Sequence, residues 1–343
     1  AGWLTLPVLF LQQYLCLGLM TLGFFLVMRG NWPGRLSLTI DRPQARAYVS
    51  EFREYSAPLF VTALFSAIAI SVERWMLQYF DGSVEQGYFS ISQRIGVACF
   101  VFVTAMIPLL TRELAVAHAK NDAREMARLL DRYAPMIYSV SAWMCCFVMV
   151  EAAAVLRLFG GEQFVGALLP VQIMALYSIH QGYGQLSGAV YYATGQTRLL
   201  RNLSLINQTV GLVMAWLFMA PGDLFGLGLG ARGLAWKMLL AQFIAVNMFL
   251  YAATRHVPFH YGRNLLHQMI CPLVCAGLAL AARFTTEAIG LGDAASLPRF
   301  FISGMLYTAI CIPASFLLPF AFGVRQGELI TQGRRLLTWF STR

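Results

Sequence analysis

Four basic side chains stand inside long apolar stretches of the sequence: Arg74, Arg94, Arg232 and Lys237. A charge at the centre of a membrane helix costs about 2.5–3.5 kcal/mol on insertion scales, so such a residue almost always faces a cavity, a partner or water. At a helical rise of about 1.5 Å per residue, Arg94 is expected at a depth of ~15 Å, Arg232 at ~12 Å and Lys237 at ~20 Å. We therefore predict that the four cations line a common aqueous cavity, which suits an anionic ligand.

Each of these cations also has a structural interpretation. Arg74 can pair with Glu73 or with Glu151, and Arg94 can form a structural pair near Gln93. The other two can extend along their helices toward the nearer membrane face, as long basic side chains do. The sequence leaves these alternatives open.

The composition excludes a water-soluble protein. Apolar residues make up 58% of the chain and charged residues 12%, against about 25% charged in an ordinary globular protein. So few charges cannot keep a surface in water, so lipid must cover much of it. The net charge of +9 is better explained by basic cytoplasmic loops than by binding of nucleic acid.

Nine stretches are long and apolar enough to cross a bilayer, which takes about 20 residues. They are 4–28, 56–80, 84–110, 133–158, 164–192, 199–219, 224–253, 265–282 and 297–321. The third, fifth and seventh carry more polar residues, which is typical of helices that line a cavity. The predicted fold class is therefore an all-α polytopic membrane protein with about nine transmembrane helices.

Basic residues alternate in density between these spans. Every second loop and the C-terminal tail together hold 18 of the 25 Lys and Arg residues, whereas the turns 81–83, 159–163 and 220–223 hold none. Because basic loops stay in the cytoplasm, this alternation assigns every loop to a side and places the C-terminus in the cytoplasm. The basic loop 111–132 is expected to form its own amphipathic helix, capped by Asp122 and Glu125. That helix could lie on the membrane surface or be a solvated connector.

No feature of the sequence indicates an enzyme. The seven cysteines lie in apolar runs without metal-ligand or redox spacing, and no phosphate-binding glycine loop or nucleophile motif occurs. A membrane glycan polymerase or ligase would need a long external loop of polar residues, and the longest predicted one, 283–296, is short. We expect no cofactor and no metal, while coupling to H⁺ or Na⁺ stays open.

Four segments resemble one transporter family. Segment 54–96 combines a proline-containing helix, the Glu73–Arg74 pair, a short turn, and then Gly87, Tyr88 and Arg94. The other segments are RLFGGEQFVGALLPVQIMAL (157–176), YYATGQTRLLRN (191–202) and GLGLGARGLAW (226–236). In order and spacing they are similar to the polysaccharide-export branch of the MOP superfamily, the Wzx-type translocators of lipid-linked oligosaccharides, which are relatives of the MATE exporters.

The resemblance implies 12 to 14 helices in two lobes around a central cavity. Residues 1–53 would then be the last helix of the first lobe with a cytoplasmic linker, 54–255 the second six-helix lobe, and 256–343 an additional C-terminal helix pair with a cytoplasmic tail. Five further spans are expected before residue 1. The predicted topology requires an odd number of spans before the first one, and the sequence begins inside a hydrophobic run without Met, so both agree with that expectation.

The implied function is non-enzymatic translocation of an undecaprenyl-diphosphate-linked oligosaccharide across the bacterial inner membrane, for polysaccharide biosynthesis. Arg94 and Arg232 would contact the anionic head group, and Arg74 and Lys237 would assist. Membrane lipids and the polysaccharide polymerase with its chain-length machinery are the expected partners, and nucleic acid is not. The alternative is a MATE-like cation-coupled exporter of small molecules, which usually needs carboxylates inside the membrane; Glu73 and Glu151 are the candidates. A scaffold role is a further alternative.

Overall fold

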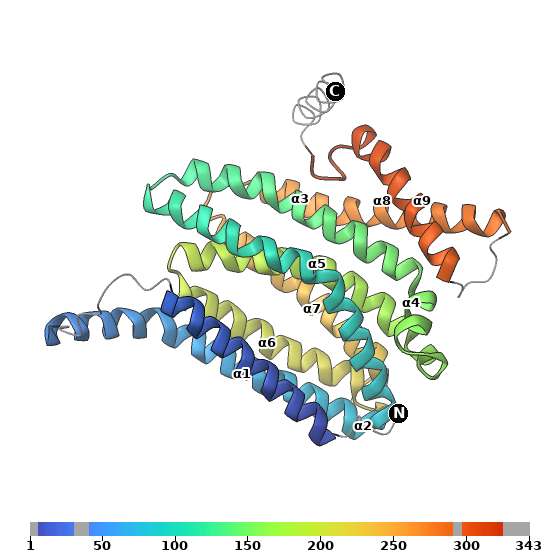
Figure 1. Ribbon diagram of the computed structural model, residues 1–343, viewed down its shortest axis with the longest axis horizontal. Helices are drawn as coiled ribbons and strands as arrows, with labels where there is room; N and C mark the ends of the chain where they lie inside the picture. The colour runs from blue at the N-terminus through green and yellow to red at the C-terminus, as the bar shows by residue number, and fades with distance from the viewer. Residues whose placement is uncertain (1–5, 31–40, 291–296, 325–343) are drawn as a thin grey trace. The chain divides into compact units, whose positions relative to one another are not determined.

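The computed structural model describes residues 6–30, 41–290 and 297–324, and throughout this part the chain forms helices and turns without strands (Figure 1). The elements are α1 (Leu6–Gly30), α2 (Arg42–Ala119), α3 (Ala123–Val150), α4 (Ala152–Phe159), η1 (Glu162–Ala167), α5 (Leu168–Ala193), α6 (Thr197–Met219), η2 (Gly222–Leu224), α7 (Gly230–Ala253), α8 (Tyr261–Ala288) and α9 (Leu297–Leu317). Eight helical segments of the described part are long and apolar enough to cross a membrane. The protein is therefore an all-α polytopic membrane protein, as the sequence predicts.

The chain divides into two compact units, Ala1–Arg53 and Glu54–Arg343. The first contains α1 and the beginning of α2. All four predicted site residues belong to the second unit, in which α8 and α9 pack together with the preceding helices.

The long helix α2 contains two spans. A straight helix of 78 residues would be roughly 117 Å long at a rise of 1.5 Å per residue, far more than the ~30 Å of hydrocarbon. The helix is interrupted at Gly82, whose φ of 83° and ψ of −174° are accessible to glycine because it has no Cβ. Figure 1 shows α2 changing direction partway along its length. The two arms therefore correspond to the predicted spans 56–80 and 84–110.

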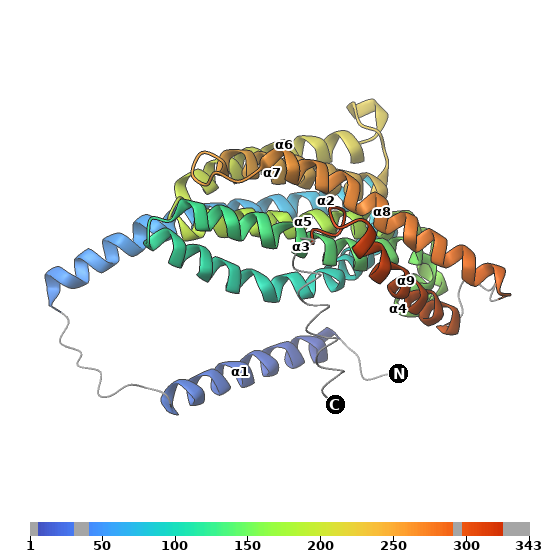
Figure 2. The same ribbon diagram turned by 90° about the horizontal axis from the view of Figure 1, so that it is seen from above.

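The second unit has two ends at which its helices connect. At one, the arms of α2 meet at Gly82, α4 leads through η1 to α5, η2 joins α6 to α7, and α8 ends; we call this the Gly82 end. At the other, α2 passes to α3 at Asn121, α5 passes to α6, and α7 passes to α8; we call this the Asn121 end. Figures 1 and 2 both show these connections at opposite ends of the helices.

The prediction of a separate helix in loop 111–132 is wrong. The helix α2 continues to Ala119, the chain turns at Asn121 with a φ of 54°, and α3 begins directly afterwards. The cap itself is present, because the Asp122 side chain accepts a hydrogen bond from the backbone N–H of Glu125 at 2.9 Å. The amphipathic face, with Met126 and Leu130 each 2% exposed, packs into the protein rather than onto a membrane surface. The pattern therefore marks the first turns of a long span.

Helix α5 forms the centre of the second unit. It packs against α3 and α7, while α6 covers α7, and α8 packs against α3 and α9. The second arm of α2 comes very close to α5 at Gly96, whose carbonyl accepts a hydrogen bond from Ser178 Oγ at 2.9 Å. A Cβ at Gly96 would lie 3.0 Å from Ser178 Oγ and 3.2 Å from the carbonyl oxygen of Met174. Small residues thus let the helix backbones approach, as is common in membrane proteins.

Candidate functional site

Arg74 connects the two arms of α2. Its side chain is half-buried on the first arm and donates hydrogen bonds to Ser90 Oγ (3.5 Å) and to Gln93 Oε1 on the second arm. The guanidinium carbon also lies 5.7 Å from the centroid of the Phe89 ring. Among the described residues Arg74 makes no ion pair with Glu73 or Glu151, so the predicted alternative of an acidic partner is not observed.

Arg94 lies one helical turn beyond Ser90 on the second arm of α2, about 18 Å from Gly82 at 1.5 Å per residue. It is exposed, and no described residue forms a hydrogen bond or an ion pair with it. Its side chain lines a groove of about 760 Å³ whose walls come from α2, α3, α4, η1 and α9. Apart from Arg94 and Ser90 the lining is almost entirely apolar: Gly87, Ile91, Ile95, Ala98, Cys99, Met144, Val148, Val155, Leu158, Phe159, Phe164 and Phe300.

A second hollow, of about 640 Å³, continues this groove between α3 and α9. The two share Met144, Val148 and Phe300. The walls of the second hollow are aromatic and aliphatic, and the Phe147 and Tyr307 rings stack across it with centroids 5.7 Å apart. Together the hollows form a long apolar surface with a cation at one side, a combination that fits an elongated ligand with an apolar part and an anionic part.

Lys237 lies inside the helix bundle, where it forms an ion pair with Glu73. Both residues are buried, at 6% and 7% exposed. The space for the ammonium depends on Gly211 of α6, because a Cβ there would lie 3.2 Å from Lys237 Cε and 3.3 Å from Nζ. The charge of Lys237 is thus balanced by a carboxylate from α2. The sequence instead favoured two other positions for this side chain, lining a cavity or extending toward the membrane face.

Arg232 lies in the first turn of α7, about 3 Å along the helix axis from Gly230 at 1.5 Å per residue. The expected depth of ~12 Å is wrong because the sequence pattern placed the start of this span at residue 224. The chain instead forms the short helix η2 and an irregular loop, in which Phe225 and Gly228 have φ values of 62° and 57°. Arg232 is exposed. For the same reason Lys237 lies about 10 Å along α7 rather than ~20 Å.

The structure therefore does not place the four predicted cations in one common cavity. Arg94 and Ser90 line the groove, and Arg74 of the first arm contacts Ser90 without lining the groove itself. Lys237 is paired in the bundle interior, and Arg232 lies at the start of another helix. The sequence did not reveal the groove, because its walls come from five elements distant in the chain. It also missed Ser90 and Phe300, since neither carries a charge or belongs to a motif.

Comparisons with known proteins support the fold. No family model matches the sequence, and no curated protein matches it. A solved structure with a similar fold is the outward-facing conformation of a multidrug resistance MATE family transporter of the MOP superfamily. The superposition has a TM-score of 0.50 and 12% sequence identity, and it covers 81% of this chain and 66% of that transporter. The chain is thus a multi-pass membrane protein with a MATE-like fold.

Proposed function

We propose that the protein is a membrane transporter that flips an undecaprenyl-diphosphate-linked oligosaccharide from the cytoplasmic to the periplasmic leaflet of a bacterial inner membrane. The observation that carries this proposal is the groove around Arg94, in which one unpaired guanidinium faces an otherwise apolar surface. The MATE-like fold supports transport in general. The segments of the sequence that are similar to polysaccharide-export translocators support the lipid-linked cargo.

The groove offers what such a cargo requires. A diphosphate loses hydration when its head group leaves water, and a guanidinium replaces that hydration with charge-assisted hydrogen bonds. The aliphatic and aromatic walls leading from Arg94 along α3 and α9 would accommodate the polyprenyl chain, whose remaining length stays in the bilayer. Arg74 would add positive potential from beside Ser90. Arg232 and Lys237 do not line this groove, so they would contribute only long-range positive potential.

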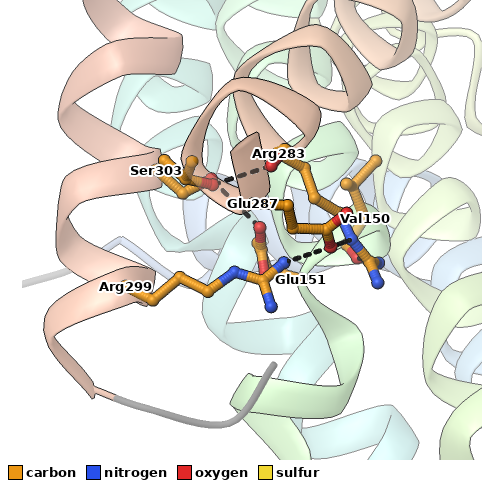
Figure 3. Close-up of polar contacts among 7 residues, drawn as sticks. Val150, Glu151, Arg283, Glu287, Arg299 and Ser303 are labelled. Atoms are coloured by element: carbon orange, nitrogen blue, oxygen red, sulfur yellow. Dashed lines mark hydrogen bonds and ion pairs between the residues drawn. The ribbon is translucent and has the colours of Figure 1, made fainter. Parts of the chain in front are cut away.

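The second candidate function is a MATE-like exporter of small cations, which fits the fold equally well. A cationic substrate would need a carboxylate that is free to bind it. The Glu73 carboxylate is occupied by Lys237. The other candidate, Glu151, is 2% exposed and accepts a hydrogen bond from Ser303 Oγ (Figure 3), and the charged group of the groove is a cation. These observations favour an anionic cargo. In the proposed orientation the Gly82 end faces the periplasm, the C-terminus is cytoplasmic, and a polysaccharide polymerase receives the flipped product.

A vesicle assay tests the function. The full chain is reconstituted into liposomes that contain a fluorescent undecaprenyl-diphosphate-linked saccharide in the outer leaflet, and loss of accessibility to a membrane-impermeant quencher reports flipping. Arg94→Ala should reduce the initial rate at least tenfold. The matched control is Arg201→Ala, because Arg201 lies near the Asn121 end and its guanidinium donates hydrogen bonds only to Asn202 Oδ1 in the described structure. Equal rates for both variants and the unmodified chain would exclude the role of Arg94. Efflux of a cationic dye without saccharide flipping would establish the exporter instead.

A further inference from the structure

A small polar pocket lies near the Asn121 end of the second unit. It has a volume of about 20 Å³, which is room for about one water molecule. Its polar lining comes from Asp131 of α3 and from Arg263 and His267 of α8. The segment that follows α9 completes the wall together with α3, through Pro135, Pro319, Phe320, Gly323 and Val324. The pocket shares no lining residue with the groove around Arg94.

His267 has one ring nitrogen without a partner. The residue is 2% exposed, and its Nδ1 is buried and has no hydrogen-bond partner within the described part of the chain. The other nitrogen, Nε2, lies 3.3 Å from Ser139 Oγ, whose own proton goes to the carbonyl of Pro135 at 2.8 Å. Ser139 Oγ is thus the acceptor for Nε2–H, and this assignment leaves Nδ1 as an unprotonated acceptor. A buried acceptor without a donor is unfavourable, so Nδ1 requires a donor from a group in the pocket.

Asp131 and Arg263 give the pocket two opposite charges. The Asp131 carboxylate accepts hydrogen bonds from the backbone N–H of His260 at 3.3 Å and from its Nδ1 at 2.9 Å, and it keeps lone pairs for further donors. Arg263 is exposed, and its guanidinium carbon lies 6.0 Å from the centroid of the Phe320 ring. No residue in the described ranges forms an ion pair with Arg263. The pocket therefore offers two acceptors inside and a cation at its outer edge.

Exposed apolar side chains adjoin the pocket on two elements. Leu266, which follows Arg263 by three residues on α8, is 53% exposed, and Leu317 and Leu318 at the end of α9 are 80% and 49% exposed. At 1.5 Å per residue, Arg263 and His267 lie about 3 Å and 9 Å from the start of α8, close to the end of a span, where lipid head groups meet the protein. A polar pocket beside an apolar, lipid-facing surface fits an amphiphile whose head group enters the pocket.

We propose that this pocket binds the head group of a phospholipid with a primary ammonium, of the phosphatidylethanolamine type. The ammonium enters the pocket and donates hydrogen bonds to Asp131 and to His267 Nδ1, the phosphate pairs with Arg263, and the acyl chains lie on the exposed leucines. A primary ammonium has three N–H donors and is similar in size to the water molecule that the pocket admits. A trimethylammonium has no N–H and is larger, and a head group without a cation leaves Asp131 without a counter-charge. The binding is non-covalent and does not depend on the identity of the cargo.

Native mass spectrometry of the full chain in detergent micelles tests the site. The probe is an equimolar mixture of phosphatidylethanolamine, its mono-, di- and trimethylated derivatives, and phosphatidylglycerol, all with the same acyl chains. The unmodified chain should retain phosphatidylethanolamine about tenfold more than the trimethylated lipid, because hydrogen bonds to charged groups are lost with the N–H donors. Retention should fall with each added methyl group, since each one replaces one donor.

Substitutions separate the roles of the three polar side chains. Asp131→Asn should remove the preference for the primary ammonium, whereas Glu113→Gln, which changes an exposed carboxylate near the same end but outside the pocket, should keep it. His267→Phe keeps an aromatic ring and removes the Nδ1 acceptor, so it should reduce the preference. Arg263→Gln should lower the retention of every phospholipid and leave the ratios between them unchanged. Its matched control is Arg255→Gln, because Arg255 is exposed and does not line the pocket.

Equal retention of the primary and trimethylated lipids would overturn the proposal, and the pocket would then hold water only. Stronger retention of phosphatidylglycerol would overturn it too, as would an Asp131→Asn chain that keeps the full preference. If that variant does not fold, the methylation series with the unmodified chain decides. Millimolar phosphoethanolamine, the same head group without acyl chains, should not displace the lipid, and displacement would overturn the lipid in favour of a soluble occupant. Saccharide flipping in vesicles is measured separately, so the failure of one proposal leaves the other standing.

Discussion

The ion pair between Glu73 and Lys237 provides the sharpest prediction about the bundle interior. The two side chains are 10% and 8% exposed, and removing one partner of a buried pair typically costs about 3–5 kcal/mol because the other charge stays buried without compensation. Lys237→Met should therefore destabilise the folded protein by about 3–5 kcal/mol, and Glu73→Gln by a similar amount. The double variant replaces both charges with groups of similar volume, and it should be within about 1 kcal/mol of the unmodified chain.

Equilibrium unfolding in mixed micelles, followed by tryptophan fluorescence, measures all four proteins in one double-mutant cycle. The coupling energy should be several kcal/mol, since the two single losses are not additive for groups in contact. Additive effects would refute the buried pair. A Lys237→Met variant that keeps its stability but loses flipping would instead show that the ammonium contacts the cargo, as the sequence suggested.

Three further outcomes are expected. Burial, and then the nearby Glu85, raise the pKa of Asp81, which lies in the turn between the two spans of α2. The folded protein thus binds this proton more tightly than the unfolded chain does, and stability falls as the pH rises above about 4, the ordinary range of Asp. Asp81→Asn should stabilise the protein at neutral pH and have no effect on stability below about pH 4. Equilibrium unfolding at neutral pH and at low pH measures this difference, and an equal effect of the substitution at both would contradict a raised pKa of Asp81. Ala98→Phe, which fills the groove one turn from Arg94, should slow flipping at least tenfold with unchanged thermal stability; an unchanged rate would remove the groove from the transport path. Gly233→Ala should destabilise by about 1–3 kcal/mol, because a Cβ would lie 2.7 Å from the carbonyl oxygen of Phe218, and a neutral result in thermal unfolding would mean that α6 and α7 separate readily.

The sequence predicts the spans of this protein well because whether a segment can cross the bilayer depends mainly on the residues of that segment itself. About 20 apolar residues cross a bilayer whatever their neighbours are, and the short turn 81–83 matches the break at Gly82. The start of α7 was misplaced for the same reason. Residues 224–229 are apolar and glycine-rich, so composition extends the span through them, whereas the backbone of Phe225 and Gly228 has positive φ and cannot continue a helix.

The candidate site was predictable only as a set of residue types. An arginine inside a span indicates either a cavity or a partner, and the choice depends on contacts between helices that a single sequence does not contain. Lys237 and Glu73 are separated by 163 other residues, yet they form an ion pair. Arg74 and Glu73 are adjacent, yet their side chains contact different partners. Successive residues of a helix point about 100° apart, so adjacent charges seldom pair with each other.

The distribution of charge across the second unit distinguishes a cation that can hold cargo from a cation that serves the structure. Cations that hold a cargo must be accessible and lack an internal counter-charge, and Arg94 meets both conditions. Lys237 meets neither condition, because it is buried and its charge is balanced by Glu73. Accessibility and pairing, rather than position within an apolar stretch, therefore decide which of the basic residues can serve the cargo.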